Sequence, residues 1–237
     1  SLICLACLFI IGVTDYLGFF QGMNSYVYDL CFRLRGPETP SNQIVIAAID
    51  EKTLEKLGRW PIARNHYSTF LNRVSQASAI VFDIILAEPS SDDLQLAKAM
   101  AKNRAIVLPV YIDHRQNLVL PTPLLKNSLV GHVHLEPSVD GVLRDVFHTL
   151  TLDGKQLPSL SSVVHGLISP SDRIESSPIL GAVLQNQGSI LQQNRMGINY
   201  YGPKETFVYL SFSDILENKF PESFFDHKII FLGLTAV

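Results

Sequence analysis

The chain has 237 residues, 47% of them hydrophobic, which suffices for one large domain with a sizeable buried core. Its 19 Lys and Arg residues and 22 Asp and Glu residues give a formal net charge of −3. No segment concentrates basic residues into the positive stripe that nucleic acid requires. The composition therefore argues against a DNA- or RNA-binding protein.

Residues 1–23 are predicted to be the C-terminal part of a transmembrane helix. Residues 2–13 hold no polar side chain beyond cysteine, and the apolar character continues to Phe20. Tyr16 lies where an interfacial aromatic belt would follow such a span. The stretch is slightly shorter than the roughly 20 apolar residues of a full span and contains Asp15, so an uncleaved signal segment and a buried core helix remain alternatives.

Residues 24–37 are predicted to continue this helix outward as an amphipathic stalk. Tyr26, Val27, Leu30 and Leu34 recur at helical spacing between charged residues, and Gly36-Pro37 supplies turn chemistry at the end. If the protein is a homodimer, as we expect, these apolar side chains are the predicted contact between two stalks.

Residues 38–237 are predicted to form one α/β domain. Apolar, β-branched runs predict buried strands at 44–49, 79–86 and 105–111. Helical patterns predict helices at 50–57 and 65–77, and a third that the capping box Ser90-x-x-Asp93 opens and that runs through Ala101. Asp50 is placed to cap the first of these helices and Gly58 to end it. This alternation predicts a parallel-rich mixed sheet flanked by helices.

The second half of the chain is predicted to be richer in strands. Its expected strands are 118–120, 130–135, 145–152, 195–201 and 228–234, and its expected helices start at Pro158 and cover 211–217. Residues 169–194 are rich in Ser, Gln, Pro and Gly, and we interpret them as a variable connection.

Several separate segments resemble one known family in their order along the chain. These are YDLCFRLRG, IVIAAIDEKTLEKLGRWPIAR, FDIILAEPSSDDLQLAKAM, SVDGVLRDVF, INYYGP and KIIFLGLTAV. Together they are similar to the type-two CHASE domain, the cyclases/histidine kinases associated sensory extracellular domain, over roughly residues 25–237. The chain departs from the family near its end, where Gly233-Leu234-Thr235 replaces the common Gly-Ala-Thr.

The resemblance implies a sensory domain outside the cytoplasmic membrane, flanked by membrane helices. It further implies a cytoplasmic output module, such as a nucleotide cyclase, a diguanylate cyclase, a histidine kinase or a Ser/Thr kinase. The expected partner is an unknown small-molecule or protein signal.

The acidic residues near the strand ends are candidates for ligand binding. Asp50 follows the first strand and Asp83 lies in the second, and ligands of open α/β sheets bind at the carboxyl edge of the strands. With Glu88 and the Asp92-Asp93 pair, they would form an acidic pocket for a cation or an amine. In the alternative interpretation, Asp50 caps a helix, Asp83 pairs with Arg64, and Asp92-Asp93 marks a helix N-terminus.

The loop that holds the single tryptophan is the other candidate. Trp60 and Arg64 would form a lid or stacking surface over a ligand, and the alternative is that Trp60 plugs the edge of the core.

We predict no bound metal and no cofactor. Cys4 and Cys7 lack further zinc ligands nearby. His132 and His134 share one face of a predicted strand, but no third ligand accompanies them.

No catalytic residue is predicted, because the motifs that common hydrolases need are missing. Asp50 is followed two residues later by Lys52, where an aspartyl-phosphate enzyme needs a second acid, and no nucleophile elbow or phosphate-binding glycine loop occurs. Two alternatives to a sensor remain: an extracytoplasmic hydrolase that uses Asp50 and Asp83, and a purely structural assembly module.

Overall fold

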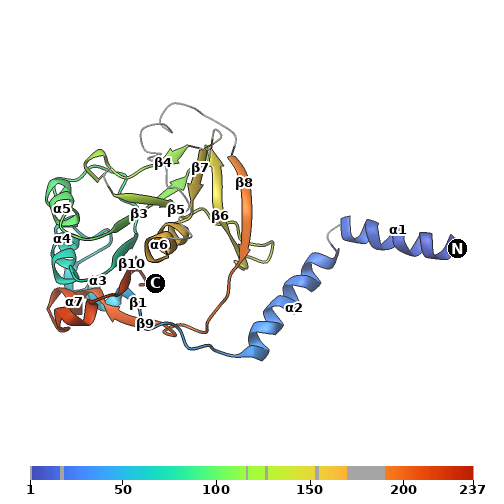
Figure 1. Ribbon diagram of the computed structural model, residues 1–237, viewed down its shortest axis with the longest axis horizontal. Coiled ribbons are helices and arrows are strands. Elements are labelled where there is room, and N and C mark those ends of the chain that lie inside the picture. Colours follow the sequence, from blue (N-terminus) through green and yellow to red (C-terminus); the bar gives the residue numbers. More distant parts are fainter. Residues whose placement is uncertain are drawn as a thin grey trace. The chain divides into compact units, whose positions relative to one another are not determined.

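Figure 1 shows the computed structural model, which describes residues 2–16, 19–115, 117–125, 128–152, 155–169 and 190–236. The chain divides into two compact units. The first consists of Ser1–Thr39 and Tyr200–Thr206, and the second of Pro40–Asn199 and Phe207–Val237.

Two helices, α1 (Leu2–Tyr16) and α2 (Phe19–Arg35), make up most of the first unit. Within the described ranges, neither these helices nor any other has both the length and the apolar character needed to cross a membrane. The transmembrane segment over residues 1–23 therefore stays a prediction. Residues 24–35 are helical, as expected, and their role as a stalk stays a prediction too.

The last turn of α2 is attached to the segment Tyr200–Thr206 of the same unit. The Phe32 and Tyr200 rings meet edge to face at 6.0 Å between centroids, and the Arg35 guanidinium donates to the Tyr200 carbonyl oxygen. The Glu38 N–H also donates to the Tyr201 carbonyl oxygen at 2.7 Å. Residues far apart in sequence are thus joined by both aromatic and hydrogen-bonded contacts.

A mostly parallel sheet forms the centre of the second unit. Within the described residues, the parallel strands run in the order β5-β3-β2-β10-β1-β9, and β4 pairs antiparallel with β3. The strands are β1 (Ile44–Ile49), β2 (Ala79–Asp83), β3 (Ile106–Ile112), β4 (Leu118–Val119), β5 (Leu129–His132), β9 (Val208–Ser211) and β10 (Ile229–Leu234). The predicted parallel-rich mixed sheet is confirmed.

Helices cover the sheet on both sides, as Figure 1 shows for α4 and α5 on one side and α6 on the other. The first side carries α3 (Glu51–Leu57), α4 (Arg64–Arg73), α5 (Asp93–Met100) and α7 (Phe212–Leu216), and the second carries α6 (Leu160–Ile168). Short 3-10 turns occur at Pro123–Leu125 and Glu222–Phe225.

The predicted caps of the first helix are confirmed. Asp50 is the N-cap of α3, and its carboxylate accepts a hydrogen bond from the Thr53 N–H. Gly58 ends the helix with φ at 101°, a backbone conformation that residues other than glycine rarely adopt.

A second, antiparallel sheet has the order β7-β6-β8, with β6 (Asp145–Leu152) between β7 (Lys155–Pro158) and β8 (Ile190–Gly197). The strand predicted over 195–201 is β8, which begins and ends earlier, so the connection predicted over 169–194 is wrong at residues 190–194. Residues 170–189 lie outside the described part of the chain. Strands β7 and β9 were not predicted, since β7 is half exposed and contains a proline and β9 has only four residues.

The helix α6 lies unusually close to β5 because Gly131 has no side chain. A Cβ atom built on Gly131 would lie 2.5 Å from the Leu160 Cα and 2.7 Å from the Leu160 nitrogen. Backbone atoms cannot move aside as the end of a flexible side chain can. Glycine at position 131 is therefore a requirement of this packing.

We expect Gly131→Ala to lower the free energy of unfolding by about 1–3 kcal/mol, the typical cost of overpacking a closely packed site. Urea unfolding would measure it. Gly233→Ala is the matched control, because the nearest atom to a Cβ atom there is 3.4 Å away, an ordinary contact. Equal stability of Gly131→Ala and the parent chain would contradict this account of the packing.

Candidate functional site

The two faces of the main sheet are covered unequally. On the first face, residues such as Val45, Phe82 and Leu232 pack against four helices in the largest apolar core. On the second face, α6 packs against Val81 and Val107, on the strands farther from β1. Among the described residues, the apolar cluster that α6 forms on this face includes Phe231 of β10 at its margin but not Ile46 of β1 or Tyr209 of β9.

The sheet face around Ile46 forms the floor of a cavity. Ile46 of β1 pairs in register with Tyr209 of β9 on one side and with Phe231 of β10 on the other, so the three side chains form a continuous row. Because side chains alternate between faces, this row lies on the opposite face from Val45 and Leu232.

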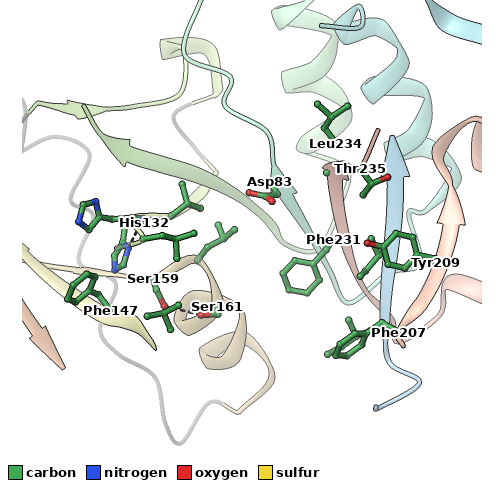
Figure 2. Close-up of a pocket in the computed structure, with 18 residues that line it drawn as sticks. Asp83, His132, Phe147, Ser159, Ser161, Phe207, Tyr209, Phe231, Leu234 and Thr235 are labelled. Atoms are coloured by element: carbon green, nitrogen blue, oxygen red, sulfur yellow. Dashed lines mark hydrogen bonds between the residues drawn. The ribbon is translucent and has the colours of Figure 1, made fainter. Parts of the chain in front are cut away.

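The cavity has a volume of about 530 Å³, and its opposite wall comes from the start of α6, the segment 132–135 and strand β6. In Figure 2, His132, Phe147, Ser159 and Ser161 stand on one side, and Phe207, Tyr209 and Phe231 on the other. Volumes of about 300–1,000 Å³ and largely apolar walls are typical of small-molecule sites.

Asp83 places a carboxylate in this apolar cavity. It is the last residue of β2, at the carboxyl edge of the sheet, and Figure 2 shows it between the two groups of side chains. Within the described part of the chain, no group donates a hydrogen bond to it or forms an ion pair with it. Solvent reaches the side chain, yet burial by the surrounding protein raises the pKa of Asp83 above its ordinary value.

The neighbour of Asp83 in the sheet is a glycine, which keeps space free beside the carboxylate. Gly233 of β10 pairs in register with Asp83. A Cβ atom at Gly233 would lie 3.4 Å from the Asp83 Cβ and 3.7 Å from its Oδ2. An alanine would therefore fit without strain but would occupy the volume next to the acid.

His132 contributes a buried imidazole to the same cavity. His132 is the last residue of β5, and only 2% of it is exposed to solvent. The His134 N–H lies 3.3 Å from Nδ1, which accepts the hydrogen bond, so the proton of the neutral ring is on Nε2. Nε2 has no hydrogen-bond partner among the described residues. Burial, with the nearby His134 and His148, lowers the pKa of His132 to about 4, so the ring is neutral at pH 7.

The serines at the start of α6 serve the helix and do not form a nucleophile for the cavity. The Ser159 hydroxyl accepts from the Ser162 N–H at 3.1 Å and so caps the helix. The Ser162 hydroxyl in turn lies 2.9 Å from His148 Nδ1, but neither of these two residues lines the cavity. The only serine–histidine pair found here among the described residues therefore points to a structural role.

Asp50, predicted as a second cavity acid, belongs to the cap of α3. Its Oδ1 accepts from the Thr53 hydroxyl at 2.6 Å and from the Ser211 hydroxyl at 2.9 Å. Burial alone would raise the pKa of Asp50, but these hydrogen bonds outweigh it and hold the pKa below its ordinary value. Asp50 is therefore not one of the residues that line the cavity around Asp83.

Arg64 pairs with Asp93, and the alternative prediction that it pairs with Asp83 is wrong. The Arg64 guanidinium donates to the nearly fully buried Asp93 carboxylate and, at 2.6 Å, to the Glu88 carbonyl oxygen. Thr122 donates to the other Asp93 oxygen at 3.1 Å. Burial alone would raise the pKa of Asp93, but these donors and the Ser90 N–H outweigh it and lower that pKa. The predicted position of Asp92 and Asp93 at a helix N-terminus is confirmed.

Of the five residues predicted to bind a ligand, Asp83 alone lines this cavity. Glu88 supplies a backbone carbonyl to Arg64, and Trp60 lies 38% exposed in the loop before α4. Ligand binding at all five residues stays a prediction. In the described ranges, no three His, Cys, Asp or Glu side chains converge as a metal site, and His134 stacks on Phe147 at 5.6 Å between ring centroids.

The sequence patterns missed His132 as a cavity residue, together with the aromatic side chains around it. A usable signal existed for His132, which ends a parallel strand as Asp83 does. Phe147, Tyr209 and Phe231 gave no comparable signal, because apolar residues in strands are typical of any core.

The cavity extends over one face of a mostly parallel sheet, from Ile44 at the start of β1 to Asp83 at the carboxyl end of β2. Its volume and its largely apolar lining are in the range that small-molecule sites have. The model of one family, the CHASE2 domain, matches residues 3–237. The chain therefore belongs to the CHASE2 domain family, a family of extracellular sensory domains. Searches among curated proteins and among solved structures found no match.

Buried, neutral His132 should make the domain sensitive to acid. The unfolded chain protonates this histidine near its ordinary pKa of 6.5, whereas the folded chain does so only near pH 4. The unfolded state therefore binds more protons between these values, and stability should fall as pH decreases from 6.5 to 4, by roughly 3 kcal/mol in total.

Urea unfolding at a series of pH values checks this prediction. His132→Gln should lose most of that pH dependence, and His114→Gln, which changes an exposed histidine, should keep it. The same pH slope in His132→Gln and the parent chain would show that another group is responsible.

Proposed function

We propose that the chain is the extracytoplasmic signal-input domain of a membrane-bound receptor, which controls a cytoplasmic output module such as a nucleotide or diguanylate cyclase or a kinase. Membership of the CHASE2 domain family across residues 3–237 is the observation that carries this proposal. The apolar run at residues 2–13 is the proposed membrane anchor. The segment itself has no catalytic role in this proposal.

The cavity is the proposed binding site for the signal molecule. It combines apolar walls with a carboxylate that has no partner within the described residues, so a ligand would find both buried surface and a polar anchor there. Ligand binding transmits a signal only if it favours one of two conformations. The wall of the cavity should therefore include a segment that continues toward the stalk.

The residues at the start of β9 link the cavity wall to the stalk-holding segment, because they follow that segment directly in the sequence. Phe207 and Tyr209 line the cavity, and they follow directly on the segment Tyr200–Thr206. That segment holds the last turn of α2 through Tyr200 and Tyr201. A shift of Phe207 or Tyr209 on ligand binding would thus be carried by a few residues to those that hold the stalk.

We further propose that the receptor is a homodimer joined through α2. Met23, Tyr26, Val27, Leu30 and Leu34 are between 37% and 78% exposed, and their spacing of three and four residues places them along one stripe of the helix. Such a stripe is typical of helices that pair along a narrow apolar seam. Arg33 and Arg35 lie in the last turn of α2, where their positive charges interact favourably with the helix dipole.

The extracytoplasmic position is testable because the body of the domain contains no cysteine. With Cys4, Cys7 and Cys31 replaced by alanine, Val139→Cys would place one thiol at a fully exposed site. In intact cells that express the full-length receptor, a membrane-impermeant maleimide should label it. Ala47→Cys, at a fully buried position, is the control and should react only after denaturation. Labelling of Val139→Cys only after lysis would refute the proposed location.

The stalk contact is testable by disulfide cross-linking of single cysteines introduced at positions 24–34 in the same cysteine-free background. Cross-linked dimer should be most abundant at Tyr26, Val27, Leu30 and Leu34, and least at Ser25 and Asp29, which face away from the stripe. A profile with no helical period would rule out α2 as the contact.

A further inference from the structure

We propose that the cavity binds a small molecule in which a protonated amine is attached to a mostly apolar body, with the ammonium group against Asp83. This inference rests on the proposed sensory function and names the chemical class of its ligand.

The fixed charge of the cavity selects for a cation. Among the described residues that line it, Asp83 is the only Asp, Glu, Lys or Arg. The other titratable side chains there are His132, His134 and Tyr209, and His132 is neutral at pH 7. An anionic ligand would meet an acid without a compensating base, whereas a cation would pair with the Asp83 carboxylate.

The geometry around Asp83 favours an ammonium group that still carries N–H bonds. The carboxylate oxygens accept no hydrogen bond from any described residue, so they are available to two or three ammonium donors. Gly233 keeps the adjacent volume open, since any side chain there would begin within 3.7 Å of Oδ2. The binding position for the amine is therefore the space between Asp83 and Gly233.

The rest of the cavity is suited to the apolar body of such a ligand. Phe147, Phe207, Tyr209 and Phe231 present aromatic rings, and Ile46 lies between two of them in the floor. Aromatic faces attract cations as well as apolar groups, so the walls and the acid favour the same class of molecule. The volume of about 530 Å³ accommodates a compound with one ring and a short amine chain.

Three probes of matched shape and different charge test the inference on the chain of residues 1–237: 2-phenylethylamine, 2-phenylethanol and 3-phenylpropionate. Isothermal titration calorimetry at pH 7 should give the tightest binding for the amine, by at least tenfold over the alcohol, and no binding of the acid. Because this comparison uses the parent chain, it does not depend on the folding of a variant.

Two substitutions then locate the amine. Asp83→Asn keeps the shape, removes the charge and breaks no hydrogen bond within the described structure, so it should stay folded and bind the amine at least tenfold more weakly. Gly233→Ala should also weaken amine binding, because the added methyl group occupies the proposed position. Asp226→Asn removes one charge at the surface, away from the cavity, and should bind the amine as the parent chain does.

Equal affinity for the alcohol and the amine, tighter binding of the acid, or full amine binding by Asp83→Asn or Gly233→Ala would each overturn the inference. Such a result would leave the proposed sensory function standing, because the thiol-labelling experiment tests the receptor's location without any ligand. Conversely, amine binding together with labelling only after lysis would support the site and refute the receptor.

Discussion

The close approach of α6 to β5 at Gly131 determines which part of the sheet remains open. With no side chain at position 131, the backbone of Leu160 lies directly against the strand. An isolated parallel β-bridge between His132 and Ser159 joins the two segments through their backbones. The helix is thereby placed over Val81 and Val107 and not over Ile46. His132, Ser159 and Leu160 also line the cavity, so this backbone contact forms part of its wall as well as fixing the position of α6.

Two aspartates of the domain show how the surroundings decide what an acid does. Asp93 is nearly fully buried, but Arg64, Thr122 and the Ser90 N–H satisfy its oxygens, and its pKa is lowered. Asp83 is more accessible, yet it has no partner among the described residues, and its pKa is raised. The first arrangement is that of a structural ion pair, and the second leaves an acid with capacity for a further interaction.

The strands of the main sheet were predictable because their β-branched, apolar runs are local signals, as Ile44–Ile49 illustrates. The cap at Asp50 was predictable for the same reason. The cavity was not, because it depends on the position of α6 and on wall residues from β6, β9 and β10, which are distant in sequence. Arg64 illustrates the limit: the sequence offers it several acids, and only the packing of α4 against α5 selects Asp93 over Asp83.

The place of β10 in the sheet has a consequence for how the protein matures. This strand pairs with β1 on one side and β2 on the other, although both are synthesised long before it. Until β10 is inserted, β1 and β2 each present an open edge, and the sheet depends on pairings between distant parts of the chain, which form slowly. Gly233 and Leu234 of β10 also line the cavity. A nascent chain therefore acquires the complete cavity only when β10 is inserted between β1 and β2, so an incompletely synthesised domain lacks the proposed ligand site.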